Sequence, residues 1–297
     1  MPELPEVETV RRGLAPVMEG ATLLKVEQRR GDLRVPFPRG FVKRLTGRKV
    51  VSVGRRAKYL LIDLDDGAVL VMHLGMSGSF RIEADGTSKG TAAYYQAPAK
   101  LSAHDHVVFH MAGVGRKAGV RIVFNDPRRF GLMDIVARSA IETSKHFRAI
   151  GIEPLGNELD GAFIAKTLAG RSAPIKASLM DQRLIAGLGN IYVCEALWRA
   201  RISPDRKAGT LATKTGKPTP AANRLADAIR EVLEAAIKAG GSSLRDHIRA
   251  TGELGDFQHA FAVYDREGEP CLRKDRGIIR RKVHSGRSTF YCPVCQG

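Results

Sequence analysis

Cysteine is scarce in this chain, which has four cysteines in 297 residues, and three of these lie between residues 271 and 297. Four cysteines are too few for a disulfide framework, and their crowding near one end favours a metal site. No run of about 18 uncharged apolar residues occurs, which excludes a membrane-spanning helix. The opening residues MPELPEVETV are acidic and lack the apolar centre of a signal peptide, so we expect a cytoplasmic protein.

Acidic residues are fewer than basic ones: the chain has 31 Asp and Glu and 48 Lys and Arg, which gives a net charge of +17. The hydrophobic share of 43% can form an ordinary core, which excludes a disordered or collagen-like chain. The length suggests about two domains. A net charge of +17 indicates a polyanionic partner. Because the basic residues are spread along the whole chain, nucleic acid is a better candidate than a membrane surface. The alternative is a solvated basic surface without a partner.

The spacing of apolar residues predicts helices at both ends of a strand-rich segment. Residues 2–19 show helical spacing, and residues 21–134 show strand-like patterns. Within the latter, residues 59–64 and 68–73 flank Asp-Asp-Gly and predict a hairpin. Residues 107–109 and 121–124 predict a second strand pair, and residues 84–103 predict a loop.

The chain becomes helical after about residue 151. One apolar stripe runs from Leu225 to Ile237 and ends at Gly240-Gly241, as at a helix C-terminus. Residues 205–220 predict a basic linker that ends in proline.

The N-terminus offers a possible nucleophile. Pro2 is small enough that we expect Met1 to be removed, leaving a secondary amine, and a terminal amine titrates near ~8, far below lysine. Such an amine can attack a carbonyl-level carbon and form an iminium. Glu3 beside it and Glu6 one turn later could donate and accept protons. The alternative is an acidic N-terminus that only complements a helix dipole.

Four internal motifs indicate contact with phosphates or bases. Lys58 follows two arginines at the start of an apolar run, and could hold a phosphate or only flank a sheet. Arg128 and Phe130 lie in a turn (DPRRFG), where a Phe beside an Arg suits insertion between bases; a core Phe is the alternative. Met76 in LGMSG could be a second wedge or a core residue. Asn190 follows Gly-Leu-Gly, which predicts an anion cradle or a plain helix cap.

The last 27 residues predict a β-hairpin with thiolate ligands. Cys292 and Cys295 form a C-x-x-C pair, and Cys271 lies upstream. A zinc ribbon would place a fourth Cys at position 274, which is Lys274 here. The chain therefore offers three thiolates, and a hairpin with three reduced thiols is the alternative. Arg287 lies at the tip of the intervening turn.

In this order the motifs resemble the formamidopyrimidine-DNA glycosylase (Fpg) family of bacterial base-excision repair. The resemblance rests on MPELPEVETVRRGL, RRAKYL, HLGMSGSF, DPRRFG, GLGNIYVCEALW, GGSSLRDHI and GRSTFYCPVCQ. It implies an α+β multidomain fold with an N-terminal helix plus β-sandwich (1–134), a helix–two-turn–helix domain (150–255) and a C-terminal zinc-ribbon-like β-hairpin (261–297). Residues 242–247 fall where the family closes a loop over 8-oxoguanine.

The resemblance also implies roles for individual residues and a mechanism through a Schiff base on Pro2. Glu3 would be the proton donor, Lys58 would assist β-elimination and Arg287 would support δ-elimination. Met76, Arg128 and Phe130 would fill the gap left by the flipped base, and Glu6 matches a buried carboxylate near the lesion. Contacts to DNA are implied for His73, His104, Arg171 and Asn190.

Zinc is the implied cofactor, as one structural ion on Cys271, Cys292 and Cys295. Lys274 departs from the four-cysteine pattern of the family, since a protonated lysine cannot bind a metal. Asp275, His284 or a water could complete the site, or the hairpin could hold no zinc. We expect weakened zinc binding on a retained hairpin.

The implied partner is damaged double-stranded DNA, bound by a monomer. Two alternatives remain at this point: an endonuclease VIII-type enzyme that prefers oxidised pyrimidines, and a DNA-binding protein without catalysis. Pro2, Glu3 and Lys58 argue against the second, because binding alone needs none of them.

Overall fold

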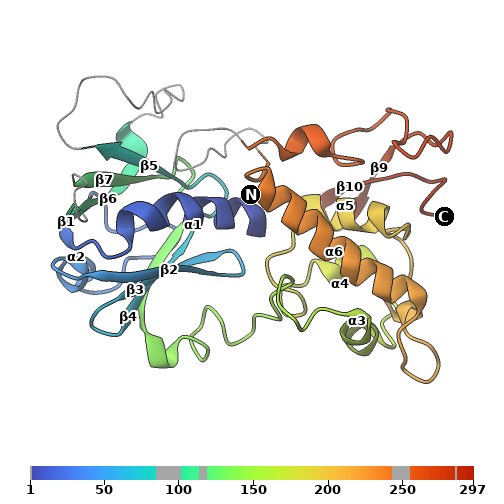
Figure 1. The fold of residues 1–297 in the computed structure, drawn as a ribbon, viewed down its shortest axis with the longest axis horizontal. Coiled ribbons are helices and arrows are strands. Elements are labelled where there is room, and N and C mark those ends of the chain that lie inside the picture. The colour runs from blue at the N-terminus through green and yellow to red at the C-terminus, as the bar shows by residue number, and fades with distance from the viewer. Residues whose placement is uncertain (1, 85–101, 114–118, 243–254, 285) are drawn as a thin grey trace. The chain divides into compact units, whose positions relative to one another are not determined.

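The computed structural model describes residues 2–84, 102–113, 119–242, 255–284 and 286–297. The chain forms two compact units. The first comprises Met1–Arg148 and Ala239–Asp256, and the second comprises Ala149–Lys238 and Phe257–Gly297 (Figure 1). No helix in the described ranges has the length and apolar character needed to cross a membrane.

The first unit is a β-sandwich with an N-terminal helix, as predicted. Helix α1 (Leu4–Met18) is followed by two four-stranded antiparallel sheets (Figure 1). One sheet has the order β1 (Leu23–Gln28), β6 (Asp105–Met111), β7 (Val120–Asn125) and β5 (Ser79–Ala84). The other has the order β2 (Val50–Arg56), β3 (Tyr59–Leu64), β4 (Ala68–His73) and β8 (Leu132–Ala137).

Both predicted strand pairs are confirmed. Strands β3 and β4 pair with Leu61 opposite Val71, and Gly67 takes φ +78° in the turn between them. Strands β6 and β7 pair with Phe109 opposite Ile122. Side chains from α1 and from both sheets form one hydrophobic cluster, which makes the sandwich a rigid support for its loops.

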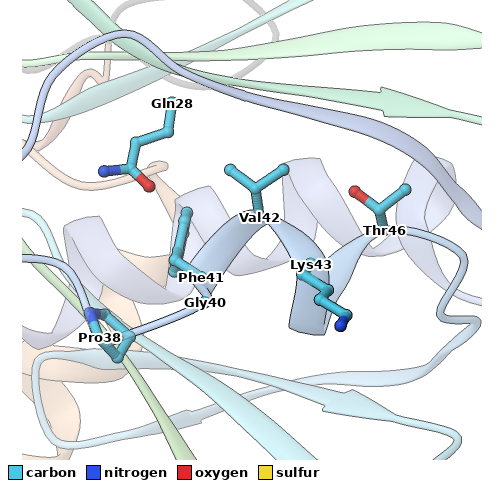
Figure 2. Close-up of a pocket in the computed structure, with 7 residues that line it drawn as sticks. All are labelled: Gln28, Pro38, Gly40, Phe41, Val42, Lys43 and Thr46. Carbon is cyan, nitrogen blue, oxygen red and sulfur yellow. The ribbon is translucent and has the colours of Figure 1, made fainter.

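Three short elements accompany the sheets: α2 (Phe41–Leu45) between β1 and β2, η1 (Ser102–His104) before β6, and η2 (Arg138–Ala140) after β8. A surface hollow of ≈ 770 Å³ borders α2, with Gln28 of β1 across from Phe41 and Val42 (Figure 2). The hollow contains none of the residues that the sequence singles out for function. Most of the predicted loop 84–103 lies outside the described residues.

The second unit combines helices with a two-stranded hairpin. Its helices are α3 (Gly161–Leu168), α4 (Ile175–Leu179), α5 (Asn190–Arg199) and α6 (Pro220–Lys238), with η3 (Ala208–Leu211) and η4 (Phe257–Ala260). Strands β9 (Arg280–His284) and β10 (Arg287–Tyr291) pair antiparallel, which confirms the C-terminal hairpin.

Two details differ from the sequence expectations. The predicted linker 205–220 contains the short helix η3, and its Pro220 is already the first residue of α6. Proline suits a helix start because its missing N–H would have no helical partner there. Asn190 is the first residue of α5 and Gly189 is the cap residue, so the Asn190 side chain is available for longer-range contacts.

Candidate active site

The start of α1 fixes two buried carboxyl groups beside Pro2, which is itself buried. Glu3 is the N-cap residue, and its backbone N–H donates to Glu6 Oε2 at 2.8 Å. The two glutamates form a reciprocal cap, with each side chain accepting from the backbone of the other. Glu3 is 3% exposed and Glu6 is 2% exposed, so both lie in the interior of the unit.

Glu6 also anchors a segment that lies more than 230 residues later in the chain. Its Oε1 accepts from the backbone N–H of Ser242 at 2.8 Å and from Ser242 Oγ at 3.1 Å. Gly241 has φ +79°, and a Cβ there would lie 3.1 Å from Glu6 Oε1. Only glycine fits this approach without strain. Of the predicted closing segment 242–247, Ser242 is the only described residue.

Arg55 connects helix α1, whose N-cap is Glu3, to the turn that carries Lys58. Lys58 follows Ala57 (φ 52°) in the tight turn from β2 to β3, and it is 6% exposed. The Arg55 guanidinium donates to Ala57 O at 2.9 Å and to Glu8 Oε2 of α1 at 3.3 Å. Burial opposes ionisation of Glu8, but its arginine partners, including Arg55, outweigh this effect and lower its pKa.

His73 is held neutral at the end of β4. Its Nδ1 accepts the Gly75 N–H at 2.9 Å, and its ring packs against Tyr59 with centroids 4.8 Å apart. Burial, followed by the positive charges of Lys58 and Arg34, lowers the pKa of His73 to about 4. At neutral pH the ring proton is therefore on Nε2, and any contact with DNA would use a neutral donor.

Met76, Arg128 and Phe130 present exposed side chains on two loops of the first unit. Met76 is 38% exposed and Phe130 is 43% exposed, in contrast to the buried majority of large apolar side chains. The Arg128 guanidinium lies over the Phe130 ring at 4.9 Å from the centroid. His104 is half-buried, and its carbonyl oxygen accepts the Asp126 N–H at 3.0 Å, so it adjoins the second loop.

In the second unit, a buried lysine joins Asn190 to the hairpin. The Lys176 ammonium donates to Asn190 Oδ1 at 2.7 Å and to Thr289 Oγ1 at 2.7 Å. Asn190 Nδ2 donates to Ser288 O at 2.8 Å. Arg287 is exposed and begins β10, next to these residues. Asn190 is thus hydrogen-bonded to the residue that directly follows Arg287 in β10.

Arg171 is also exposed in the second unit, where it follows α3. Its Nε donates to Thr167 O at 3.1 Å, which holds the guanidinium against the end of that helix. Arg171 is therefore held by a different part of the unit from Asn190, which Lys176 holds.

Comparison with known proteins decides the family. The model of the formamidopyrimidine-DNA glycosylase N-terminal domain matches residues 1–133, and that of the H2TH domain matches residues 150–247. A formamidopyrimidine-DNA glycosylase of Beijerinckia indica is 62% identical over 297 residues, and one of Chelativorans sp. is 59% identical over 299 residues. Both alignments cover 100% of each chain. This chain belongs to the formamidopyrimidine-DNA glycosylase family.

Solved structures of Fpg proteins share the whole fold. A Lactococcus lactis Fpg mutant in complex with Fapy-dG containing DNA is 32% identical, with a TM-score of 0.81 and 99% coverage of both chains. The Fpg protein from Thermus thermophilus is 38% identical, with a TM-score of 0.79 and coverage of 100% of this chain and 99% of that chain.

The three cysteine sulfurs near the C-terminus lie close to an aspartate instead of a fourth cysteine. The sulfurs of Cys271, Cys292 and Cys295 and a carboxylate oxygen of Asp275 all lie within 4.8 Å of one another. Gly277 makes room for this group, because a Cβ there would lie 2.4 Å from Cys292 Sγ. Lys274 is exposed and has φ 55°, so its side chain lies outside the cluster. The donor set suits a divalent cation that accepts both sulfur and oxygen.

His284, the other protein side chain considered for the fourth position, lies elsewhere. Its Nε2 contacts Asp205 Oδ1 at 2.7 Å, and its Nδ1 contacts Thr289 Oγ1 at 3.3 Å. Of these two side chains, Asp275 is the one that the structure places among the sulfurs.

The sequence did not reveal two buried charged residues, Lys176 and Asp126, that hold the predicted site residues in place. Lys176 lies in a short apolar segment, where one lysine looks like a surface residue, yet it is 1% exposed. The sequence marks Asp126 only as part of a turn, yet it is fully buried. The signal for Asp126 is its place in DPRRFG, since an aspartate before proline often accepts from the turn that follows.

Proposed function

We infer that this chain is a DNA glycosylase of base-excision repair that removes oxidised purines and then cleaves the abasic site. The support is full-length similarity to Fpg proteins and structural similarity to Fpg bound to Fapy-dG and to abasic DNA. The observation that carries the chemistry is the buried Pro2 next to two fixed carboxyl groups at the start of α1.

We propose that Pro2 is the nucleophile, once Met1 has been removed. Its secondary amine attacks C1′ of the lesion nucleotide, and the bond from C1′ to the damaged base breaks. The amine then loses its proton and the C1′–O4′ bond of the sugar opens, which gives an iminium. Glu3 supplies the proton that O4′ takes as the sugar opens; it directly follows Pro2 in the chain, is buried, and shares the reciprocal cap with Glu6. The iminium acidifies the 2′ proton, and elimination releases the 3′ and then the 5′ phosphate. Lys58 assists the first elimination and Arg287 the second.

Binding of damaged double-stranded DNA is proposed to use residues of both units. Met76, Arg128 and Phe130 fill the space left by the flipped base, and their exposure supports this role. Asn190 holds the lesion phosphate. His73, His104 and Arg171 are proposed to contact the strand nearby. We propose one lesion bound per monomer, with functional segments 1–134, 150–255 and 261–297.

We further propose that Cys271, Asp275, Cys292 and Cys295 hold one structural zinc ion. When bound, zinc would link the two ends of the C-terminal segment and keep the hairpin in place. The protein itself supplies the rest of this support, because Trp198 Nε1 donates to Cys271 Sγ at 3.4 Å and Gly277 N–H donates to Asp275 Oδ1 at 2.8 Å. The replacement of a thiolate by a carboxylate predicts weaker binding than a four-cysteine site gives.

Borohydride trapping on DNA that contains 8-oxoguanine opposite cytosine tests the catalytic proposal. The protein is prepared with a removable N-terminal extension, and aliquots are compared before and after cleavage to a free Pro2. Only the cleaved form should give a covalent adduct, and mass spectrometry should place it on Pro2. An equal adduct from both forms would exclude the terminal amine.

A panel of duplexes separates the alternatives. Preference for thymine glycol over 8-oxoguanine would favour an endonuclease VIII-type enzyme. Tight binding without any adduct from the cleaved form would leave a DNA-binding protein without catalysis.

Zinc release tests the metal proposal without using activity. Purified protein should carry one zinc per chain, and a colorimetric chelator should extract it faster from Asp275→Ala and more slowly from Asp275→Cys. Glu267→Ala is the control, because Glu267 is exposed in the same segment and its ion pair with Arg281 is 3.9 Å long. Equal release from Asp275→Ala and the parent protein would remove Asp275 from the ligand set.

A further inference from the structure

Two loops of the first unit meet around a buried carboxylate, which none of the proposed catalytic steps uses. Asp126 follows β7 at the start of the loop that carries Arg128 and Phe130, and it is 0% exposed. Ser77 lies in the loop after β4, directly after Met76, and it is 5% exposed. These positions are 49 residues apart in the sequence, so the contact between them is a long-range constraint.

Both oxygens of Asp126 accept hydrogen bonds from loop residues. Oδ1 accepts from Ser77 Oγ at 2.5 Å, and Oδ2 accepts from the Gly131 backbone N–H at 2.7 Å. Ser77 Oγ in turn accepts from the Arg128 backbone N–H at 3.2 Å. One carboxylate and one hydroxyl therefore fix the residue after Met76, the backbone of Arg128 and the residue after Phe130.

The backbones of the two loops are also in direct contact. A Cβ on Gly75 would lie 2.3 Å from the carbonyl carbon of Phe130, and Gly75 has φ +65°. The start of the second loop is also held by β6, where His106 Nε2 forms a hydrogen bond with Asp126 O at 2.9 Å. The loops therefore cannot shift independently without loss of buried hydrogen bonds.

We propose that Asp126 and Ser77 are positioning residues that hold Met76, Arg128 and Phe130 as one preformed wedge for base flipping. The inference rests on the proposed role of these three side chains. A wedge whose loops are already ordered does not lose loop entropy when it enters the duplex, so less of the binding free energy is spent on ordering. Both residues are buried, so we expect them to act through the wedge and not by contacting DNA.

Ser77→Ala tests this arrangement, with Ser52→Ala as the matched control. Ser52 Oγ also donates to an aspartate of the first unit, Asp63, at 2.8 Å, but it does so within the β2–β3 ladder. Two substrates are compared in single-turnover reactions. A duplex with 8-oxoguanine opposite cytosine requires the wedge, and a single strand with a preformed abasic site requires only the amine chemistry.

Ser77→Ala should slow excision from the duplex about tenfold or more, the effect of losing a hydrogen bond to a charged group. Cleavage of the single-stranded abasic site should stay within about twofold of the parent protein. Ser77→Thr, which keeps the hydroxyl, should restore duplex excision, and Ser52→Ala should leave both reactions unchanged. Equal losses on both substrates, or unchanged duplex excision, would overturn the proposal.

A double-mutant cycle with Phe130→Ala adds a second test. If Ser77 acts through the wedge, Ser77→Ala should cost much less once Phe130 has been truncated. Fully additive losses would contradict the proposal. A parent protein that cleaves neither substrate would instead refute the proposed enzymatic function, and the inference would fall with it.

Discussion

Replacement of the buried Lys176 by methionine tests whether Asn190 and the hairpin are held by one internal charge. Methionine keeps most of the length of the side chain and removes the ammonium. It leaves Asn190 Oδ1 and Thr289 Oγ1 without the donor that now lies 2.7 Å from each. The Ser288 carbonyl also loses its longer contact of 3.4 Å.

The expected cost follows from two opposing effects. Each close hydrogen bond from a charged donor contributes about 1.5–3 kcal/mol, so two of them contribute roughly 3–6 kcal/mol. Removal of a buried charge recovers several kcal/mol of desolvation, which offsets part of this loss. We expect a net destabilisation of about 1–3 kcal/mol, because Thr289 Oγ1 remains buried and Asn190 Oδ1 partly buried. This corresponds to a decrease in Tm of roughly 2–10 °C.

The salt dependence of DNA binding distinguishes a positioning role from a phosphate contact. Lys176 is 1% exposed, so it should contact no phosphate. Lys176→Met should therefore weaken binding while the slope of log K against log salt stays constant, whereas loss of a direct contact lowers the slope by about 0.9. The exposed Lys166 of α3 gives a matched Lys→Met control for stability. A slope that falls by one contact, with unchanged Tm, would refute the reasoning.

Three further predictions concern other parts of the chain. The pKa of His73 is about 4 in the folded protein, below that of an unfolded histidine, so the unfolded state binds more protons between about pH 4 and 6.5. The neutral ring therefore contributes stability above about pH 6.5, and this stability is lost as pH falls towards 4. His73→Gln should flatten the pH dependence of the unfolding free energy in that range, measured by urea titration. Gly241→Ala should lower both stability and base excision more than Gly67→Ala does. Both glycines have φ near +78°, but only at Gly241 would a Cβ approach a neighbour, Glu6. Equal effects of the two variants would mean that the contact with Glu6 is irrelevant. Glu195→Ala should destabilise the protein by about 3 kcal/mol or more, since Glu195 accepts the backbone N–H groups of residues 262–264, two of them in fully buried hydrogen bonds. Thermal unfolding, with the exposed Glu234→Ala as control, checks this.

Most of the fold could be predicted because its elements follow local patterns. The apolar spacing of α1 and α6 and the Asp-Asp-Gly turn between β3 and β4 each determine an element within a few residues. The family resemblance supplied the arrangement of these elements. The return of Ala239–Asp256 to the first unit could not be inferred from local patterns, because it depends on the pairing of Ser242 with Glu6 across the chain.

The candidate site was predictable where side chains lie in short motifs, and less so where they act through distant partners. Pro2, Glu3 and Lys58 stand out by residue type and position, and their roles remain predictions. Asp275 is one of several options that the sequence leaves open for the fourth ligand position. A lysine at position 274 removes the expected cysteine, but only the left-handed backbone of Lys274 shows how the next residue reaches the sulfurs.

Three buried acidic residues of this basic chain, Glu6, Asp126 and Glu195, lie where one side chain must hold several hydrogen-bond donors. Glu6 accepts from Glu3 and Ser242, Asp126 from Ser77 and Gly131, and Glu195 from residues 262–264. A carboxylate can accept several N–H or O–H groups, which a basic side chain cannot do. Buried carboxylates therefore join segments that share no strand or helix, and they do so without placing negative charge on the surface.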